Sequence, residues 1–149
     1  MLAILLAAEL LGAEVLERVR AAGHPQVRYS HGFVFQVLGP GPASIGELAA
    51  ALGVTSQAVS QSVTELERLG YVERCASEHD GRRRIVALTK RGKDAVSRGR
   101  RVRASLGREL AQAIGEGRSA AMAAALADSL EARGGMEAIA ARRVRPVAG

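Results

Sequence analysis

The chain has 149 residues, 48% of them hydrophobic but only 3% aromatic, and it carries a net charge of +6. This length suits one compact domain, with a core built mainly from Leu, Val, Ile and Ala. A single cysteine excludes an internal disulfide, and no segment is long and apolar enough to cross a membrane. The apolar start has no basic residue before Arg18, which argues against a signal peptide and favours a cytoplasmic protein.

Residues 2–21 are predicted to form a first helix with more apolar surface than a small domain needs. Two rows of apolar side chains recur along it at helical spacing, so its apolar face is unusually broad. The rows consist of Ile4, Ala8, Leu11, Val15 and Val19, and of Leu2, Leu6, Leu10 and Ala13. This surplus indicates that the helix packs against something beyond its own lobe.

Two short helices joined by a tight turn are predicted within residues 43–69. Ser44 and Glu47 have the spacing of a capping box, so the first of these helices should begin directly after Ser44. Gly53 should end it, and Thr55 is a suitable N-cap for the next helix. This order is that of a helix-turn-helix. The buried stripe of the second helix is formed by Val59, Val63 and Leu66.

The opposite face of that second helix carries short side chains that form hydrogen bonds and bear little charge. Such a composition suits contacts with base edges and phosphate oxygens in a groove of DNA. The candidate DNA-contacting residues on this helix are Thr55, Ser56, Gln57, Ser60, Gln61 and Thr64.

A two-stranded hairpin is predicted after this helix, which Gly70 closes. Residues 71–75 begin the first strand, Asp80-Gly81 marks the turn, and residues 84–88 alternate as the returning strand. A basic hairpin beside a helix-turn-helix is a wing, and the two together are shaped to grip a DNA duplex. The candidate DNA-contacting residues of the wing are Arg82, Arg83 and Arg84.

A long helix is predicted over residues 89–114, and its first part is strongly basic. Eleven Lys or Arg residues lie between positions 82 and 108, against Asp94 as the one acidic residue. A solvated helix face is the ordinary explanation of such a charge run. Next to a wing, however, the run favours binding to the phosphate backbone, because binding releases counterions. Lys90 and Arg91, in the first turn, are expected nearest to the phosphates.

A further helix is predicted over about residues 119–133, between the glycines at 115–117 and Gly134-Gly135. We interpret residues 1–27 and 104–149 as dimerisation helices, and residues 28–103 as a winged helix-turn-helix lobe, within a single compact domain. The surplus of apolar surface favours a homodimer, and a monomeric bundle of the same helices is the alternative.

Six segments follow one another with a characteristic order and spacing between about residues 28 and 100. They are Glu47-Leu48-Ala49, Leu52-Gly53-Val54, Val59 to Leu66, Leu69 to Arg74, Asp80-Gly81-Arg82 and Leu88 to Gly92. This set resembles the MarR family of bacterial winged-helix repressors. The resemblance implies a mainly α fold with a small β-wing (α+β), and a homodimer in which the first and last helices of two chains interleave.

The resemblance also implies how DNA is bound. The helix over about residues 55–69 would enter the major groove, Arg82 would reach into the adjacent minor groove, and Asp80 would orient the wing arginines by ion pairing. Many relatives carry Arg or Lys where this chain has Gln61, so one phosphate or guanine contact would be missing. Two subunits would then occupy an inverted repeat with half-sites about 10 base pairs apart.

A pocket for a small aromatic or anionic effector is a further implication of the resemblance. It would lie between the dimerisation helices and the DNA-binding lobe, so Arg28, Tyr29 and His31 are candidate ligand-binding residues. A core or capping role is the alternative for each of them. The function implied is that of a ligand-responsive repressor in the cytoplasm, associated with the nucleoid, whose DNA affinity falls when the effector binds.

No motif in the chain indicates an enzyme, a cofactor or a metal site. There is no Gly-rich phosphate loop and no nucleophile elbow. His24, His31 and His79 lack metal-ligand spacing with one another or with Cys75, which is interpreted as a buried inert thiol. Two alternatives stay open: a winged-helix module that binds a protein, and a DNA-binding regulator that responds to a metal or to a thiol oxidant. The wing arginines favour DNA over a protein partner.

Overall fold

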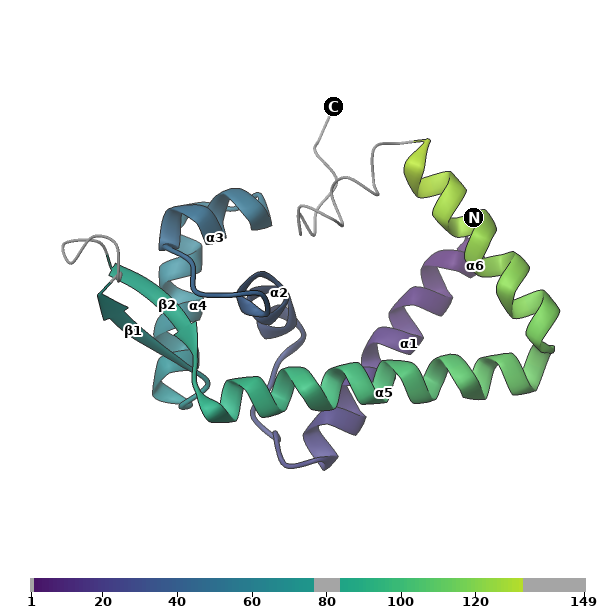
Figure 1. Cartoon of the computed structure of the whole chain (residues 1–149), viewed down its shortest axis with the longest axis horizontal. Coiled ribbons are helices and arrows are strands. Elements are labelled where there is room, and N and C mark those ends of the chain that lie inside the picture. Colours follow the sequence, from purple (N-terminus) through teal and green to yellow (C-terminus); the bar gives the residue numbers. More distant parts are fainter. Residues whose placement is uncertain (1, 77–83, 133–149) are drawn as a thin grey trace.

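The computed structural model describes residues 2–76 and 84–132. In these residues six helices and two strands form a mainly α-helical fold with a two-stranded wing, which confirms the predicted fold class (Figure 1). The predicted turn with Asp80, Arg82 and Arg83, and the tail from residue 133, lie outside the described residues. The elements are α1 (Leu2–Ala21), α2 (Tyr29–Leu38), α3 (Ile45–Leu52), α4 (Ser56–Arg68), β1 (Val72–Ala76), β2 (Arg84–Leu88), α5 (Lys90–Ile114) and α6 (Glu116–Glu131).

The helix-turn-helix consists of α3 and α4, and its local signals act as predicted. The Ser44 hydroxyl accepts a hydrogen bond from the Glu47 backbone, and the Glu47 carboxylate accepts one from the Ser44 N–H at 2.7 Å. Gly53 ends α3 with φ 63°, a left-handed conformation that a Cβ would disfavour. Thr55 caps α4 by accepting a hydrogen bond from the Ala58 N–H. These caps set the angle at which α4 leaves the turn.

One hydrophobic core holds α2, α3, α4 and the wing together. The buried side of α4 faces this core, and each fully buried apolar side chain contributes roughly 1.5–3 kcal/mol. The two aromatic rings at the centre, Phe35 and Tyr71, lie 5.6 Å apart. Residues with no more than 2% of their surface exposed include Val34, Leu38, Leu48, Val59, Val63, Leu66, Tyr71, Val72 and Val86.

The wing is an antiparallel pair in which Val72 faces Leu88 and Ala76 faces Arg84. Ala43, just before α3, adds a short bridge to Val86 through two backbone hydrogen bonds of 3.0 and 2.8 Å. This bridge ties the wing to the helix-turn-helix. Cys75 is partly exposed in β1, so the expectation of a buried thiol was wrong. Cys75 points to the side of the strand opposite the buried Val72, the side on which Glu73 is exposed.

The start of α5 is joined closely to Tyr71, the residue just before β1. The Thr89 N–H donates to the Tyr71 carbonyl at 3.1 Å, and the Thr89 hydroxyl donates to the Gly70 carbonyl at 2.7 Å. A Cβ on Gly92 would lie 2.1 Å from the Tyr71 carbonyl oxygen. His24 completes this joint, because its two ring nitrogens lie 3.2 Å from the Tyr71 hydroxyl and 3.0 Å from a carboxylate oxygen of Asp94.

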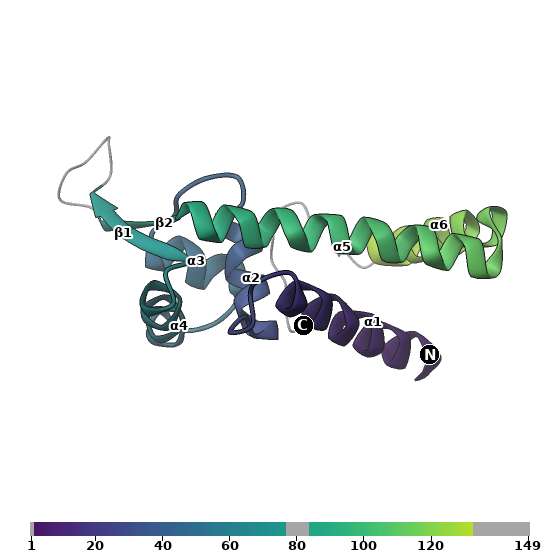
Figure 2. The same cartoon turned by 90° about the horizontal axis from the view of Figure 1, so that it is seen from below.

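The remaining helices extend away from this lobe (Figure 2). α1 packs against α5, where Arg18 pairs with Glu109 at 2.6 Å and holds the pKa of that carboxyl at about 2. α6 begins at Glu116, three residues before the predicted start, because Gly115 alone makes the break, with φ 91°. None of the described helices is long and apolar enough to span a membrane.

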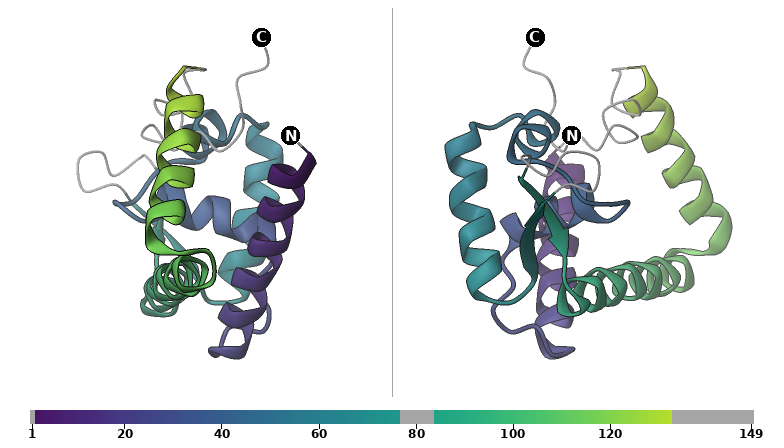
Figure 3. Two further views of the ribbon diagram at one scale, coloured as in Figure 1. Left: turned by 90° about the vertical axis from the view of Figure 1, so that its right-hand side faces the viewer. Right: turned by 60° about the vertical axis from the view of Figure 1, so that its left-hand side comes forward.

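Both helices at the far end leave apolar side chains uncovered. α6 buries none of its residues, and α1 buries only Val19. Figure 3 shows α6 turning back from the end of α5 and lying apart from α1. A monomeric bundle would cover such side chains, and the described part of this chain does not. The exposed large apolar residues at this end are Leu2, Ile4, Leu5, Leu6, Leu10, Leu11, Met122, Leu126 and Leu130.

Candidate nucleic-acid interface

The exposed face of α4 is polar, as the sequence predicted. Val59, Val63 and Leu66 fix the helix to the core from the other side. Ser60 is half-buried at the edge of the exposed face. The exposed members of the predicted set are Thr55, Ser56, Gln57, Gln61 and Thr64.

The hydrogen bonds on α4 separate these residues into two groups. The Thr64 hydroxyl donates to the Ser60 carbonyl at 2.9 Å and accepts a hydrogen bond from Arg74 at 3.1 Å. Arg74, a residue that the sequence analysis did not single out, also pairs with Glu67 and so links β1 to α4. The side-chain amides of Gln57 and Gln61 form no hydrogen bond with any other described residue. These two amides are therefore available to a ligand in the groove.

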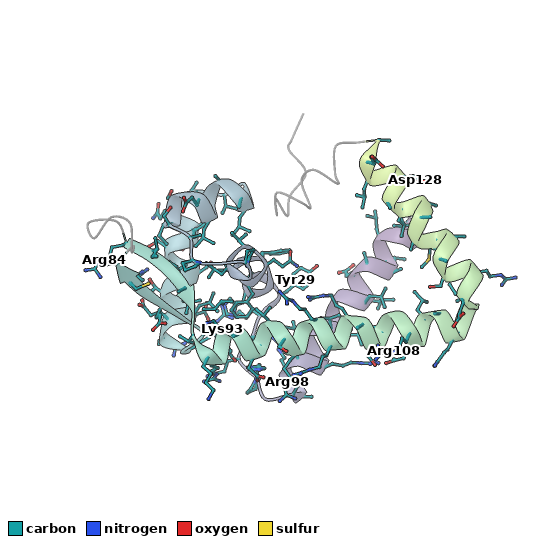
Figure 4. The ribbon with its side chains drawn as sticks, viewed as in Figure 1. Tyr29, Arg84, Lys93, Arg98, Arg108 and Asp128 are labelled. Carbon is teal, nitrogen blue, oxygen red and sulfur yellow. The ribbon has the colours of Figure 1, made fainter. Side chains whose placement is uncertain are left out.

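The outer end of the wing lies apart from the start of α5. Arg84 is exposed at the outer end of β2, well away from Lys93 in the first turns of α5 (Figure 4). Lys90 and Arg91 are exposed, but they follow Thr89, which is bonded to Gly70 just beyond the C-terminal end of α4. The structure therefore does not bring Lys90 and Arg91 to the end of α4 where Thr55 begins it. The guanidinium of Arg91 instead lies 4.6 Å above the Tyr71 ring.

The candidate ligand-binding residues at the start of α2 differ in their surroundings. His31 is 1% exposed, and its Nδ1 accepts a hydrogen bond from the Arg28 backbone N–H at 3.2 Å. His31 therefore has the core and capping role that was the alternative to ligand binding. Burial lowers the pKa of His31, so the ring is neutral at pH 7. The Arg28 guanidinium reaches across to α4, where it pairs with Glu65 at 2.7 Å.

A cavity of about 420 Å³ lies between α1, α2 and α5. Arg28 and Tyr29 line it, and His31 does not. The cavity wall has an apolar part and a basic part, and no acidic residue is among the described residues that line it. Its apolar part includes Val15, Leu16, Val19, Phe33, Phe35 and Val96, and its basic part consists of Arg28, Arg100 and Arg103. The two arginines of α5 were missed because in the sequence they form part of a longer charge run.

His24, His31 and Cys75 do not form a metal site in the part of the chain that the structure describes, and His79 lies outside it. His24 is 3% exposed and is bonded to Tyr71 and Asp94, and this bonding lowers the pKa of Asp94. Its role is to join the α1–α2 turn to the wing base and to α5.

Comparison with known proteins agrees with this geometry. Residues 30–83 match the sequence model of the MarR family. No curated protein matches the chain. RV1404 from Mycobacterium tuberculosis has 25% identity and a TM-score of 0.77, with 89% of this chain and 90% of that chain covered. Streptococcus pneumoniae FabT, solved in complex with DNA, has 25% identity and a TM-score of 0.70, with 87% and 93% covered. Staphylococcus aureus MepR bound to ethidium bromide is similar in fold, with 20% identity, a TM-score of 0.62, and 85% and 93% covered.

Proposed function

Since the chain belongs to the MarR family of DNA-binding transcriptional regulators, we propose that it is a ligand-responsive repressor that binds an inverted-repeat operator as a homodimer. The observation that carries the proposal is the polar face of α4, with the unoccupied amides of Gln57 and Gln61, beside a wing strand that begins at Arg84. The DNA complex of the similar protein FabT supports this assignment.

Selection from a random pool of duplexes tests the operator. The expected product is an inverted repeat, because a homodimer with two-fold symmetry presents two copies of α4 to the DNA. The half-sites should lie about 10 base pairs apart, so that the two copies of α4 enter the major groove from the same side of the duplex. A pool that yields no consensus, or a single unpaired site, contradicts the proposed function.

Gln57→Ala is expected to change which bases are selected rather than to weaken all duplexes equally. Gln57 lies on the exposed face of α4, and its amide can donate to and accept from one base edge. Losing such a contact should cost roughly 1–3 kcal/mol at one position of the site. Selection with the variant should therefore lose stringency at that position, and an unchanged consensus would show that Gln57 does not read a base.

Arg82→Ala is expected to weaken operator binding by roughly 1–3 kcal/mol and to leave the fold intact. Arg82 lies outside the described residues, but it precedes Arg84 by two positions in the predicted turn. A gel-shift titration measures the effect, with circular dichroism as the check on folding. A folded variant that binds the operator as tightly as the intact chain would exclude the wing contact.

The cavity supports a particular class of effector. Its apolar wall suits a hydrophobic body, while Arg28, Arg100 and Arg103 favour a carboxylate or another anionic group. MepR was solved with ethidium bromide. The basic wall of the present cavity favours an anion of similar apolar character. An effector here would contact α1, α2 and α5 together, and so could alter how the dimer holds its two lobes.

The uncovered apolar side chains of α1 and α6 support the homodimer. Large apolar side chains that are exposed together at one end of a protein mark an interaction site. It lies at the end of the molecule away from α4 and the wing, so pairing there leaves both DNA-binding faces free (Figure 1).

A further inference from the structure

Arg28 lies between the cavity and α4. Arg28 lines the cavity between α1, α2 and α5, and its Nη2 lies 2.7 Å from Oε1 of Glu65 on α4. Arg28 thus lines the cavity and also forms an ion pair with a side chain of α4. A change in the cavity that moves Arg28 therefore changes the surroundings of Glu65 on α4.

Glu65 is poorly placed for a protein that binds phosphates. It follows Gln61 by four residues, so it lies one turn further along the same side of α4. Its side chain keeps 25% of its surface exposed. A carboxylate this close to a DNA groove repels the phosphates unless a cation neutralises it, because like charges brought together at an interface are costly.

Arg28 is the cation that faces Glu65. His31 is the other titratable group beside this carboxylate, with Nε2 at 3.5 Å from Oε2, but burial keeps its ring neutral at pH 7. The Arg28 side chain is 64% exposed, so its guanidinium can turn toward the cavity without crossing the core. Arg28 can thus exchange the Glu65 carboxylate for a carboxylate bound in the cavity.

We propose that Arg28 is a positioning residue for DNA binding: it neutralises Glu65 beside the DNA-facing side of α4, and an anion in the cavity that takes up its guanidinium exposes the Glu65 charge to the DNA. This inference rests on the proposed function. It locates the link between cavity and DNA affinity in one ion pair, and it requires no movement of the lobes.

A double-mutant cycle tests the ion pair without any effector. Arg28→Gln should weaken binding of the selected operator about tenfold, because Glu65 is then uncompensated. Glu65→Gln should bind within about twofold of the intact chain or more tightly, and the double variant should recover to within about threefold. The matched control is the exposed pair Arg20 and Glu17 on α1, also at 2.7 Å, whose glutamine variants should be additive.

The salt dependence separates this role from a direct phosphate contact. If Arg28 itself touched a phosphate, Arg28→Gln would lower the slope of log affinity against log salt by about 0.9, and Glu65→Gln would not restore binding. Thermal unfolding of each variant shows whether a loss of binding reflects loss of fold. Operator binding by the intact chain with an additive cycle overturns the inference and leaves the proposed function standing, whereas no operator binding at all rejects the proposed function.

Two probes of one shape test the cavity. Naphthalene-2-carboxylate should weaken operator binding by the intact chain, and the neutral naphthalene-2-carboxamide should not, since only the carboxylate competes for Arg28. In Glu65→Gln the carboxylate should still bind, as followed by its fluorescence, without weakening operator binding. The proposal that an anion draws Arg28 away from Glu65 is overturned by either of two results. One is that millimolar carboxylate leaves operator binding by the intact chain unchanged, and the other is that it weakens operator binding by Glu65→Gln as much as by the intact chain.

Discussion

A chain carrying Leu6→Glu together with Leu10→Glu is expected to sediment as a monomer and to bind the paired operator about a hundredfold more weakly than the intact chain. Both leucines lie on one side of α1, with exposed fractions of 49% and 71%, so the subunit does not need them for its own core. Charges at these positions would have to be buried in a dimer, which is costly when they are unpaired. Two linked half-site contacts act at high effective concentration, and a monomer loses that advantage.

A duplex with one half-site provides the control for this experiment. The double variant and the intact chain should bind it equally, because α4 and the wing are unchanged. The intact chain should sediment as a dimer at micromolar concentration. A species near the 15.6 kDa chain mass for the intact chain contradicts the homodimer, and with it the inverted-repeat operator.

Gly92→Ala is expected to lower the free energy of unfolding by about 1–3 kcal/mol or more. The added Cβ would lie 2.1 Å from the Tyr71 carbonyl oxygen and 3.0 Å from a methyl group of Leu88. Backbone at that distance cannot yield as a flexible side chain would, so α5 must move off the wing base. The hydrogen bond from Thr89 to Tyr71 would be lost with it. Urea denaturation followed by circular dichroism measures the change.

Gly107→Ala is the matched control, since it makes the same substitution further along α5. Gly107 is exposed, and a Cβ there would meet no atom within 4 Å. Alanine should stabilise this position by about 0.5–1 kcal/mol, because glycine loses more backbone freedom in a helix. Equal stabilities for the two variants would show that the joint between α5 and Tyr71 is not close-packed.

Much of the fold follows from signals between near neighbours in the chain. Ser44 and Glu47 start α3, Gly53 ends it, and Thr55 starts α4 where the sequence predicted. A cap or a left-handed glycine acts through hydrogen bonds and sterics within a few residues, so its pattern is legible without the rest of the protein. The same holds for β2, whose bounds match the predicted residues 84–88.

The candidate interface was predictable only in part. The polar face of α4 follows from helical spacing once the buried stripe is known. Spacing does not show which of its groups are already bonded, and Thr64 is held by Arg74 from β1, ten residues away. Nor does it show that Lys90 and Arg91 start beside the far end of α4. Those facts depend on how β1 and α5 return to the helix.

The caps and the apolar stripes of the elements can be predicted from the sequence, because they depend on local sterics and periodicity. That Gly92 meets the Tyr71 carbonyl, and that Arg28 both lines a cavity and pairs with Glu65, follows only from how the helices pack. These contacts join residues that lie far apart in the chain. They arise only when α2, α4 and α5 pack on one core, since packing sets the distances on which close approach and ion pairing depend.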